Sequence, residues 1–193
     1  MSTATDRLSP LTSQAVFRVL LESLARPGRV FQLPEKSDEV GPGIVPLALA
    51  VIGSKVAVMG APEWQTRICR ATGAQPAGLE EASLVAIYGM AEAVTITRLR
   101  RGHAEAPEDG AKVGLACGAL CAGNTGNKGE TTIELTGPGV PGRTLLGVDG
   151  VGREVFDALR AANAMFPAGV DVWLVDERGR VAGLPRSARQ AVV

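Results

Sequence analysis

An α/β fold with interleaved helices and strands is the architecture that this sequence predicts. Segments whose apolar residues recur with the period of an α-helix alternate with short runs rich in Val, Ile and Leu, which are typical of buried strands. The 24 glycines and 12 prolines supply the turns that many short elements need, more than a helical bundle would use. Aromatic residues make up only 4% of the chain, so we expect an aliphatic core.

The first predicted element is an amphipathic helix over residues 12–24, followed by a tight turn and a strand. Its apolar residues recur at i, i+4 and i+7, and Thr12 or Ser13 is expected to cap it. The Arg-Pro-Gly sequence at 26–28 ends the helix, because proline cannot continue the hydrogen-bond ladder and glycine tolerates a left-handed turn. Residues 30–33 then predict a short strand.

The middle of the chain predicts alternating helices and strands. The segment 90–100 is ambiguous, because Val-Thr-Ile-Thr at 94–97 favours a strand, whereas its flanks and its place between strands favour a helix, which we predict. In order, the elements are a helix near 46–52, a strand at 55–59, a helix beginning at Pro62, a strand at 84–88 and the helix at 90–100.

The last part of the chain predicts two hairpins separated by a strand and a helix. Strands at 113–122 and 131–136 are expected to pair as one long hairpin through the turn-rich segment 123–129. The elements that follow are a strand at 143–148, a helix at 151–163, and strands at 170–175 and 181–184 joined by a turn at 177–179.

Length and charge limit the classes of function. At 193 residues one hydrophobic core can serve the whole chain, so we expect a single domain over residues 1–193. Twenty Lys and Arg balance 20 Asp and Glu, which gives no overall field that would attract nucleic acid or an anionic membrane. The start shows no signal-peptide pattern, and the three cysteines fit reduced thiols. We therefore expect a cytoplasmic protein without a nucleic-acid or membrane partner.

Two glycine-rich segments are candidates for nucleotide binding. Residues 137–142, Gly-Pro-Gly-Val-Pro-Gly, satisfy the G-x-G-x-x-G pattern after a predicted strand. A dinucleotide site needs free backbone N–H groups and a following helix, whereas here prolines take two positions and residues 143–147 look extended. Residues 126–129 lack the Lys-Ser/Thr pair of a phosphate loop. Structural turns are favoured for both segments, and nucleotide binding at 137–142 is kept as the alternative.

Cysteine, histidine and lysine could also carry chemistry. A zinc site would need Cys69, Cys117, Cys121 and the only histidine, His103, to converge, so ordinary thiols are favoured. His103 lies in a polar loop, and we interpret it as a loop residue rather than a catalytic base. No lysine has a sequence setting that suggests a desolvated amine, so we expect no pyridoxal cofactor. The lysines are Lys36, Lys55, Lys112 and Lys128.

Arginines are stronger candidates for binding. Arg18 and Arg26 flank the end of the first predicted helix, and Arg186 follows Leu-Pro at 184–185. Guanidinium groups suit phosphate or phosphonate oxygens and equally the carboxylates of an interface. The sequence leaves these roles open, together with the simpler role of helix-end or surface charge.

Several stretches of the chain resemble the PhnH family of subunits from the bacterial carbon–phosphorus lyase machinery, which serves phosphonate use. They occur in the family's order, and together they are far more specific than any one alone. The chain departs from the family pattern at residues 52–54 and 71–73. The matching stretches are Phe-Arg at 17–18, Leu-Ala-Arg-Pro-Gly at 24–28, Ala-Pro-Glu-Asp-Gly-Ala at 106–111, Leu-Thr-Gly-Pro-Gly-Val at 135–140, Phe-Pro-Ala-Gly-Val-Asp at 166–171 and Leu-Pro-Arg-Ser at 184–187.

The resemblance implies a three-layer αβα fold with a mixed sheet, similar to a trimmed pyridoxal-phosphate-dependent transferase that binds no cofactor. It also implies a homodimer within a core complex with PhnG, PhnI and PhnJ. That complex is associated with transfer of a triphosphoribosyl group from ATP to an alkylphosphonate, as in ribose 1-methylphosphonate 5-triphosphate synthesis. PhnI is the expected seat of the transfer, and this chain its support.

We therefore predict a non-autonomous subunit in which no residue is assigned a catalytic, metal or cofactor role. The polar members of the matching stretches, Arg18, Arg26, Asp171 and Arg186, are the predicted binding or interface residues. One alternative is an autonomous nucleotide- or phosphonate-binding enzyme that uses the 137–142 loop. A purely architectural protein, in which alanine is tolerated at the three arginines, is the other.

Overall fold

A central seven-stranded sheet organises the computed structural model, which describes residues 8–34, 38–123 and 130–193. The strand order is β1-β10-β9-β5-β4-β2-β3. The run from β3 to β9 is parallel, and β10 and β1 are antiparallel to their neighbours, so the predicted mixed sheet is confirmed. The strands are β1 (Phe31–Gln32), β2 (Lys55–Met59), β3 (Gln75–Pro76), β4 (Leu84–Ile87), β5 (Lys112–Cys117), β9 (Asp171–Asp176) and β10 (Arg180–Leu184).

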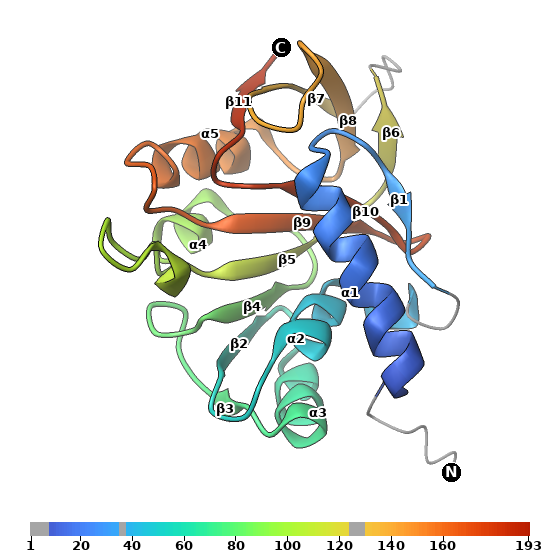
Figure 1. Cartoon of the computed structure of the whole chain (residues 1–193), viewed down its shortest axis with the longest axis vertical. Coiled ribbons are helices and arrows are strands. Elements are labelled where there is room, and N and C mark those ends of the chain that lie inside the picture. The colour runs from blue at the N-terminus through green and yellow to red at the C-terminus, as the bar shows by residue number, and fades with distance from the viewer. Residues whose placement is uncertain (1–7, 35–37, 124–129) are drawn as a thin grey trace.

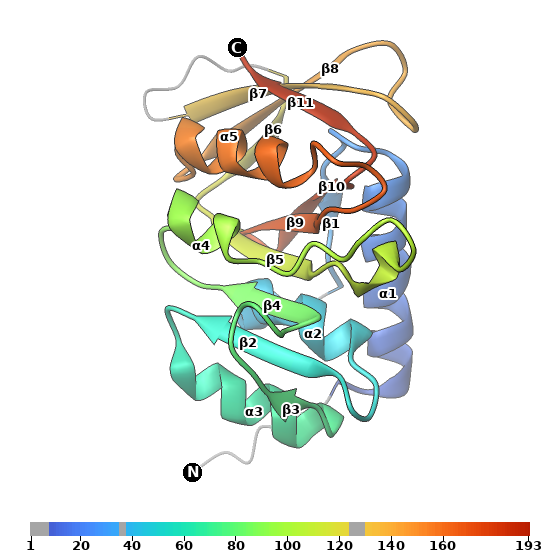
Figure 2. The same cartoon turned by 90° about the vertical axis from the view of Figure 1, so that its left-hand side faces the viewer.

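Helices cover both faces of this sheet, which confirms the three-layer αβα arrangement (Figures 1 and 2). Alternate residues of β9 show why: Trp173 and Val175 pack with the first helices, whereas Val172 and Leu174 face the later ones. The first face carries α1 (Pro10–Ala25), α2 (Ile44–Leu49) and α3 (Pro62–Thr72), and the second carries α4 (Ala93–Thr97) and α5 (Arg153–Ala162). Short 3₁₀ turns, η1 (Asp38–Gly43) and η2 (Pro107–Asp109), complete the helical elements of the described residues.

A second sheet of four strands, in the order β11-β7-β8-β6, lies at the end of the molecule that carries the C-terminus (Figure 1). Its apolar residues Ile133, Leu135, Leu146 and Val148 share one core cluster with Phe156 of α5. The second sheet therefore packs on the same side of the central sheet as α5 and adds to the core there. Its strands are β6 (Leu120–Ala122), β7 (Glu130–Thr136), β8 (Thr144–Asp149) and β11 (Arg189–Val192).

The predicted long hairpin between 113–122 and 131–136 is wrong. The first segment divides into β5, which joins the central sheet, and β6, which pairs with β8 rather than β7. The division lies at Gly118 and Ala119, where the backbone turns to exchange hydrogen bonds with Asp149 at 2.9 Å each. Leu145 and its neighbours in β8 thereby separate the two strands that were expected to pair.

The other elements are found close to their predicted positions, with changes at their ends. Ser9, rather than Thr12 or Ser13, caps α1, because its Oγ accepts a hydrogen bond from the Thr12 N–H at 3.1 Å. The ambiguous segment forms the helix α4, as predicted. Helix α2 begins and ends earlier than expected, with Pro46 in its first turn, where a missing N–H costs little. Strands β3 and β11 were not predicted.

One buried carboxylate joins the two sheets. Asp176, whose side chain is fully buried at the end of β9, accepts a hydrogen bond from the Leu120 N–H of β6 at 3.2 Å. The same carboxylate accepts the N–H groups of Arg178 and Arg180 at 2.9 and 2.8 Å and the Arg180 Nε at 2.7 Å. It therefore closes the β9–β10 turn and holds the second sheet against the first. Within the described part of the chain, no helix is long and apolar enough to cross a membrane.

Candidate functional site

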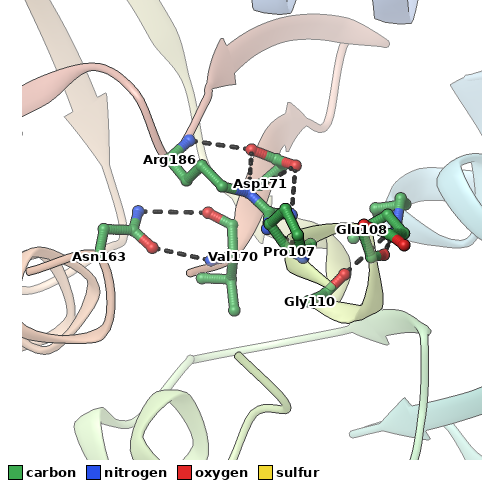
Figure 3. Close-up of polar contacts among 8 residues, drawn as sticks. Pro107, Glu108, Gly110, Asn163, Val170, Asp171 and Arg186 are labelled. Carbon is green, nitrogen blue, oxygen red and sulfur yellow. Dashed lines mark hydrogen bonds and ion pairs between the residues drawn. The ribbon is translucent and has the colours of Figure 1, made fainter. Parts of the chain in front are cut away.

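Two of the four predicted site residues meet in one ion pair beside the amino end of β9 (Figure 3). Arg186 Nη2 lies 2.7 Å from Asp171 Oδ2, and Arg186 Nε lies 3.2 Å from both carboxylate oxygens. The backbone N–H of Arg186 also donates to Asp171 Oδ1 at 2.9 Å. The side chains are only 11% and 18% exposed, so little solvent screens the pair.

The same arginine connects three of the matching stretches. Its Nη1 donates to the carbonyl of Pro107, so segments 106–111, 166–171 and 184–187 meet at one junction. Gly110 is required here because a Cβ at this position would lie 2.8 Å from Arg186 Nη1 and 2.1 Å from the Gly169 carbonyl oxygen. The close backbone approach therefore explains one glycine of the matching stretches.

Lys112 lies beside this junction. Its amine is partly desolvated, so the expectation that no lysine amine is desolvated is wrong. Its Nζ donates to the carbonyls of Glu108 at 2.8 Å and Gly110 at 3.3 Å. Burial lowers the pKa of the Lys112 amine, and the positive charge of Arg186 lowers it further. Two donors are already engaged with carbonyls of the η2 turn, so the amine helps to close that turn. Lys36 and Lys128 lie outside the described residues, and Lys55 pairs with Glu81 at 2.8 Å.

Asn163, which sequence reasoning missed, fixes the other side of the junction. Its Oδ1 accepts the Val170 N–H at 2.8 Å, and its Nδ2 donates to the Val170 carbonyl at 3.2 Å (Figure 3). Because Asn163 directly follows α5, these bonds tie the end of the helix to the start of β9. The available signal was an asparagine at the last position of the predicted helix, a residue type that is common where helices end.

A pocket of about 620 Å³ opens next to this junction, at the carboxyl end of α5. Arg186 and Asn163 form part of its wall, so the ion pair and the asparagine hold that wall in place. Three lining residues are arginines, and none of the described residues around the pocket is acidic. The cationic and polar lining residues are Arg160, Asn163, Arg186, Ser187, Arg189 and Gln190.

The other two predicted residues lie elsewhere, Arg18 on α1 and Arg26 directly after its last residue. Arg26 pairs with Glu22 at 2.9 Å one helical turn away, and both side chains are about half exposed. Arg18 is exposed on the same helix. The structure thus separates the predicted set into a buried pair and two surface arginines. The pair is largely buried, whereas Arg18 and the half-exposed Arg26 are accessible at the surface.

The glycine-rich segment 137–142 is the loop between β7 and β8. A strand follows it rather than a helix, as the sequence indicated, so it has no helix N-terminus to hold a pyrophosphate. Gly139 has φ +78, and a Cβ there would lie 2.3 Å from the carbonyl oxygen of Ala25. This contact brings the stretches 24–28 and 135–140 together. Residues 126–129 lie outside the described residues.

Replacing Gly139 with valine is expected to destabilise the fold whether or not any nucleotide binds. Valine disfavours the left-handed backbone region and would clash with the end of α1, so the free energy of unfolding should fall by about 3 kcal/mol. Urea unfolding followed by circular dichroism measures this. Gly142→Val, with φ +73 but nothing within 4 Å of its Cβ, is the matched control and should lose clearly less. Equal losses would contradict the role of the Ala25 contact.

The thiols and the histidine occupy ordinary surroundings. None of the three cysteines, Cys69, Cys117 and Cys121, forms a disulfide in the described structure. Burial raises the pKa of the Cys69 and Cys117 thiols, which suppresses their thiolate forms. His103 is exposed in a loop. Its backbone N–H and carbonyl exchange hydrogen bonds with the backbone of Ala106. Within the described ranges, no cluster of three His, Cys, Asp or Glu residues could hold a metal ion.

Comparison with known proteins gives two results. A family model described as bacterial phosphonate metabolism protein (PhnH) matches residues 7–191. The chain is also 29% identical over 176 residues to the "Putative C-P lyase subunit protein HtxG" of Stutzerimonas stutzeri, covering 90% of this chain and 83% of that protein. The family match includes the three segments that meet at Arg186. It also includes the stretches 24–28 and 135–140, which approach each other at Ala25 and Gly139.

Proposed function

Since the chain belongs to the PhnH family of bacterial phosphonate metabolism proteins, we propose that it works as a non-autonomous subunit of a carbon–phosphorus lyase complex. The observation that carries this proposal is that polar residues of the matching stretches bind one another within the fold. Asp171 and Arg186 neutralise each other and hold three segments together, so they do not form an acid–base pair open to a substrate. The similarity to a protein named as a C–P lyase subunit supports the same role.

The finer parts of the proposal come from the family resemblance. The chain would support the transfer of a triphosphoribosyl group from ATP to an alkylphosphonate, with the chemistry in a PhnI-type partner. Residues 1–193 would act as one domain in a cytoplasmic homodimer, alongside PhnG- and PhnJ-type subunits. Its αβα core would derive from a pyridoxal-phosphate-dependent transferase fold that has lost the cofactor.

Helix α1 is the proposed contact surface for a partner subunit. Its outer side exposes Leu11, Phe17 and Leu21, whose side chains are 81%, 41% and 51% exposed. Phe17 and Leu21 are four positions apart, so they lie next to each other on one face of the helix. Adjacent exposed apolar residues of this size mark candidate interaction surfaces. Arg18 lies on the same helix, and arginine beside aromatic and aliphatic residues is a composition common at protein interfaces.

Replacing Phe17 with serine and Arg18 with glutamate is expected to weaken assembly without unfolding the chain. Both residues are exposed, so the free energy of unfolding should change by less than about 1 kcal/mol. Co-expression with the other subunits and affinity purification should recover the wild-type complex and at least about fivefold less of the double variant. Arg153→Glu, an exposed arginine on α5, is the charge-matched control for Arg18→Glu.

Two outcomes would overturn the proposal. If the wild-type chain failed to co-purify with its partners, the subunit role would be wrong. If the purified chain alone converted ATP and methylphosphonate, the chain would be an autonomous enzyme instead.

A further inference from the structure

The pocket at the carboxyl end of α5 forms a surface separate from the α1 contact. It opens where α5 and β11 lie against each other (Figure 2), and none of its described lining residues belongs to α1. Its volume of about 620 Å³ is large enough to receive side chains of another protein. The exposed residues around it indicate what kind of partner it fits.

Two large apolar side chains extend from the loop that follows α5. Met165 is 79% exposed, and Phe166, which lines the pocket, is 65% exposed. Backbone hydrogen bonds fix the loop: the Ala168 N–H donates to the Met165 carbonyl at 3.0 Å, and the Gly169 N–H donates to the Arg101 carbonyl at 2.7 Å. Because the loop is already fixed, a partner that covers these side chains loses little binding energy to ordering it.

The wall of the pocket carries positive charge that the fold leaves unneutralised. Arg186 is neutralised by Asp171. Arg160 pairs with Asp157 at 2.9 Å, but the Arg160 side chain is 64% exposed, so water weakens that pair. Arg189 is exposed and has no ion pair within the described part of the chain. Since none of the described lining residues is acidic, this surface complements a partner that carries a carboxylate.

The mixture of residues favours a protein partner. Arginine, phenylalanine and methionine are enriched at protein–protein interfaces. Met165 is not among the lining residues, so the exposed apolar surface continues beyond the pocket wall. A second copy of this chain fits poorly, because neither the loop 163–169 nor β11 contains an acidic residue. Two copies meeting through this surface would therefore bring arginine against arginine.

We propose that Arg160, Met165, Phe166 and Arg189, together the α5 pocket surface, bind a segment of another subunit that carries an acidic residue next to a large apolar one. The carboxylate pairs with Arg189, and the apolar side chain enters the pocket against Phe166. That the segment belongs to a subunit of the same complex rests on the proposed function. The chemistry of the segment rests on the pocket.

Calorimetric titration of the full chain with two short peptides tests the chemistry. The probe is the acetylated peptide amide Gly-Glu-Phe-Glu-Gly, and the matched peptide has glutamine in place of both glutamates. At low ionic strength the acidic peptide should bind at least about fivefold more tightly, and added salt should reduce the difference. Equal affinities for the two peptides, or no binding of the acidic peptide at millimolar concentration, would overturn the proposal.

Two variants locate the binding on this surface. Arg189→Gln should remove the preference for the acidic peptide, and Phe166→Ser should weaken both peptides by about fivefold. Both side chains are exposed, so the melting temperature should stay close to that of the wild type. The control Arg153→Gln, at the opposite end of α5, should change neither affinity. Unchanged affinities in both pocket variants would show that the peptides bind elsewhere and would contradict the assignment.

Hydrogen–deuterium exchange tests whether a subunit occupies the surface. In the co-purified complex, the amides of segments 163–168 and 186–190 should exchange at least about tenfold more slowly than in the chain alone. Unchanged exchange in a complex that does form would overturn the assignment to a subunit contact while leaving the subunit role intact. A chain that prefers the acidic peptide but never joins a complex would overturn the subunit role while leaving the recognition of an acidic segment intact.

Discussion

Replacing Asp176 with alanine is expected to lower the free energy of unfolding by about 4 kcal/mol, the largest loss among the substitutions considered for this protein. The carboxylate is fully buried and accepts four hydrogen bonds, three from backbone N–H groups and one from Arg180. Alanine would leave those donors unpaired and the Arg180 guanidinium, only 27% exposed, without its counter-charge. Urea unfolding monitored by tryptophan fluorescence measures the loss, since Trp173 is buried in β9.

Asp157→Ala is the matched control for this substitution. Asp157 pairs with Arg160 on the surface of α5, and the Arg160 side chain is 64% exposed. Exposed pairs contribute little, so the control should lose less than about 0.5 kcal/mol. Asp176→Asn should fall between the two, because it keeps one acceptor oxygen and loses the charge. A loss below about 1 kcal/mol for Asp176→Ala would show that the carboxylate does not join the two sheets as described.

Replacing Arg186 with alanine is expected to cost about 3 kcal/mol of unfolding free energy. The substitution leaves Asp171 as a largely buried charge without its partner and removes the bond to the Pro107 carbonyl. Segments 106–111, 166–171 and 184–187 would then lose their shared contact. For a chain of this size the melting temperature should fall by about 6–12 °C, which differential scanning calorimetry resolves.

A double-mutant cycle separates the ion pair from simple loss of packing. The coupling energy between Arg186→Ala and Asp171→Ala should exceed about 1 kcal/mol, because each residue depends on the other. The control pair is Arg143 with Glu134, whose atoms lie 3.4 Å apart with the arginine 76% exposed, and its coupling should be close to zero. If Arg186→Ala left the free energy of unfolding unchanged, this arginine would not stabilise the fold, and a role in binding would be favoured instead.

Local patterns were sufficient to predict most helices and strands of this chain. The amphipathic period of α1, the proline that opens α3 and the apolar runs of β2 and β4 each act within a few residues, so they can be recognised without the fold. The family stretches were also visible as strings of residues. These local signals led to an α/β fold with a mixed sheet and to the PhnH family.

Strand pairing and the contacts of polar residues could not be predicted in the same way. Strand β6 pairs with β8, and Gly118 marks the change of sheet, because hydrogen bonds to Asp149, some 30 residues away, compete with the expected hairpin. The two strands that were missed, β3 and β11, lie at sheet edges, and their residues become extended by pairing with β2 and β7. Local propensity does not contain that information.

The sequence by itself therefore determined the fold class, the order of most elements and the family to which the chain belongs. Only the tertiary structure decided that Asp171 and Arg186 form one buried pair while Arg18 and Arg26 stay on the surface of α1. It alone brought Gln190 and three arginines around one pocket. The physical reason is that propensity and periodicity act between near neighbours, whereas burial and ion pairing depend on residues that only the folded chain brings into contact.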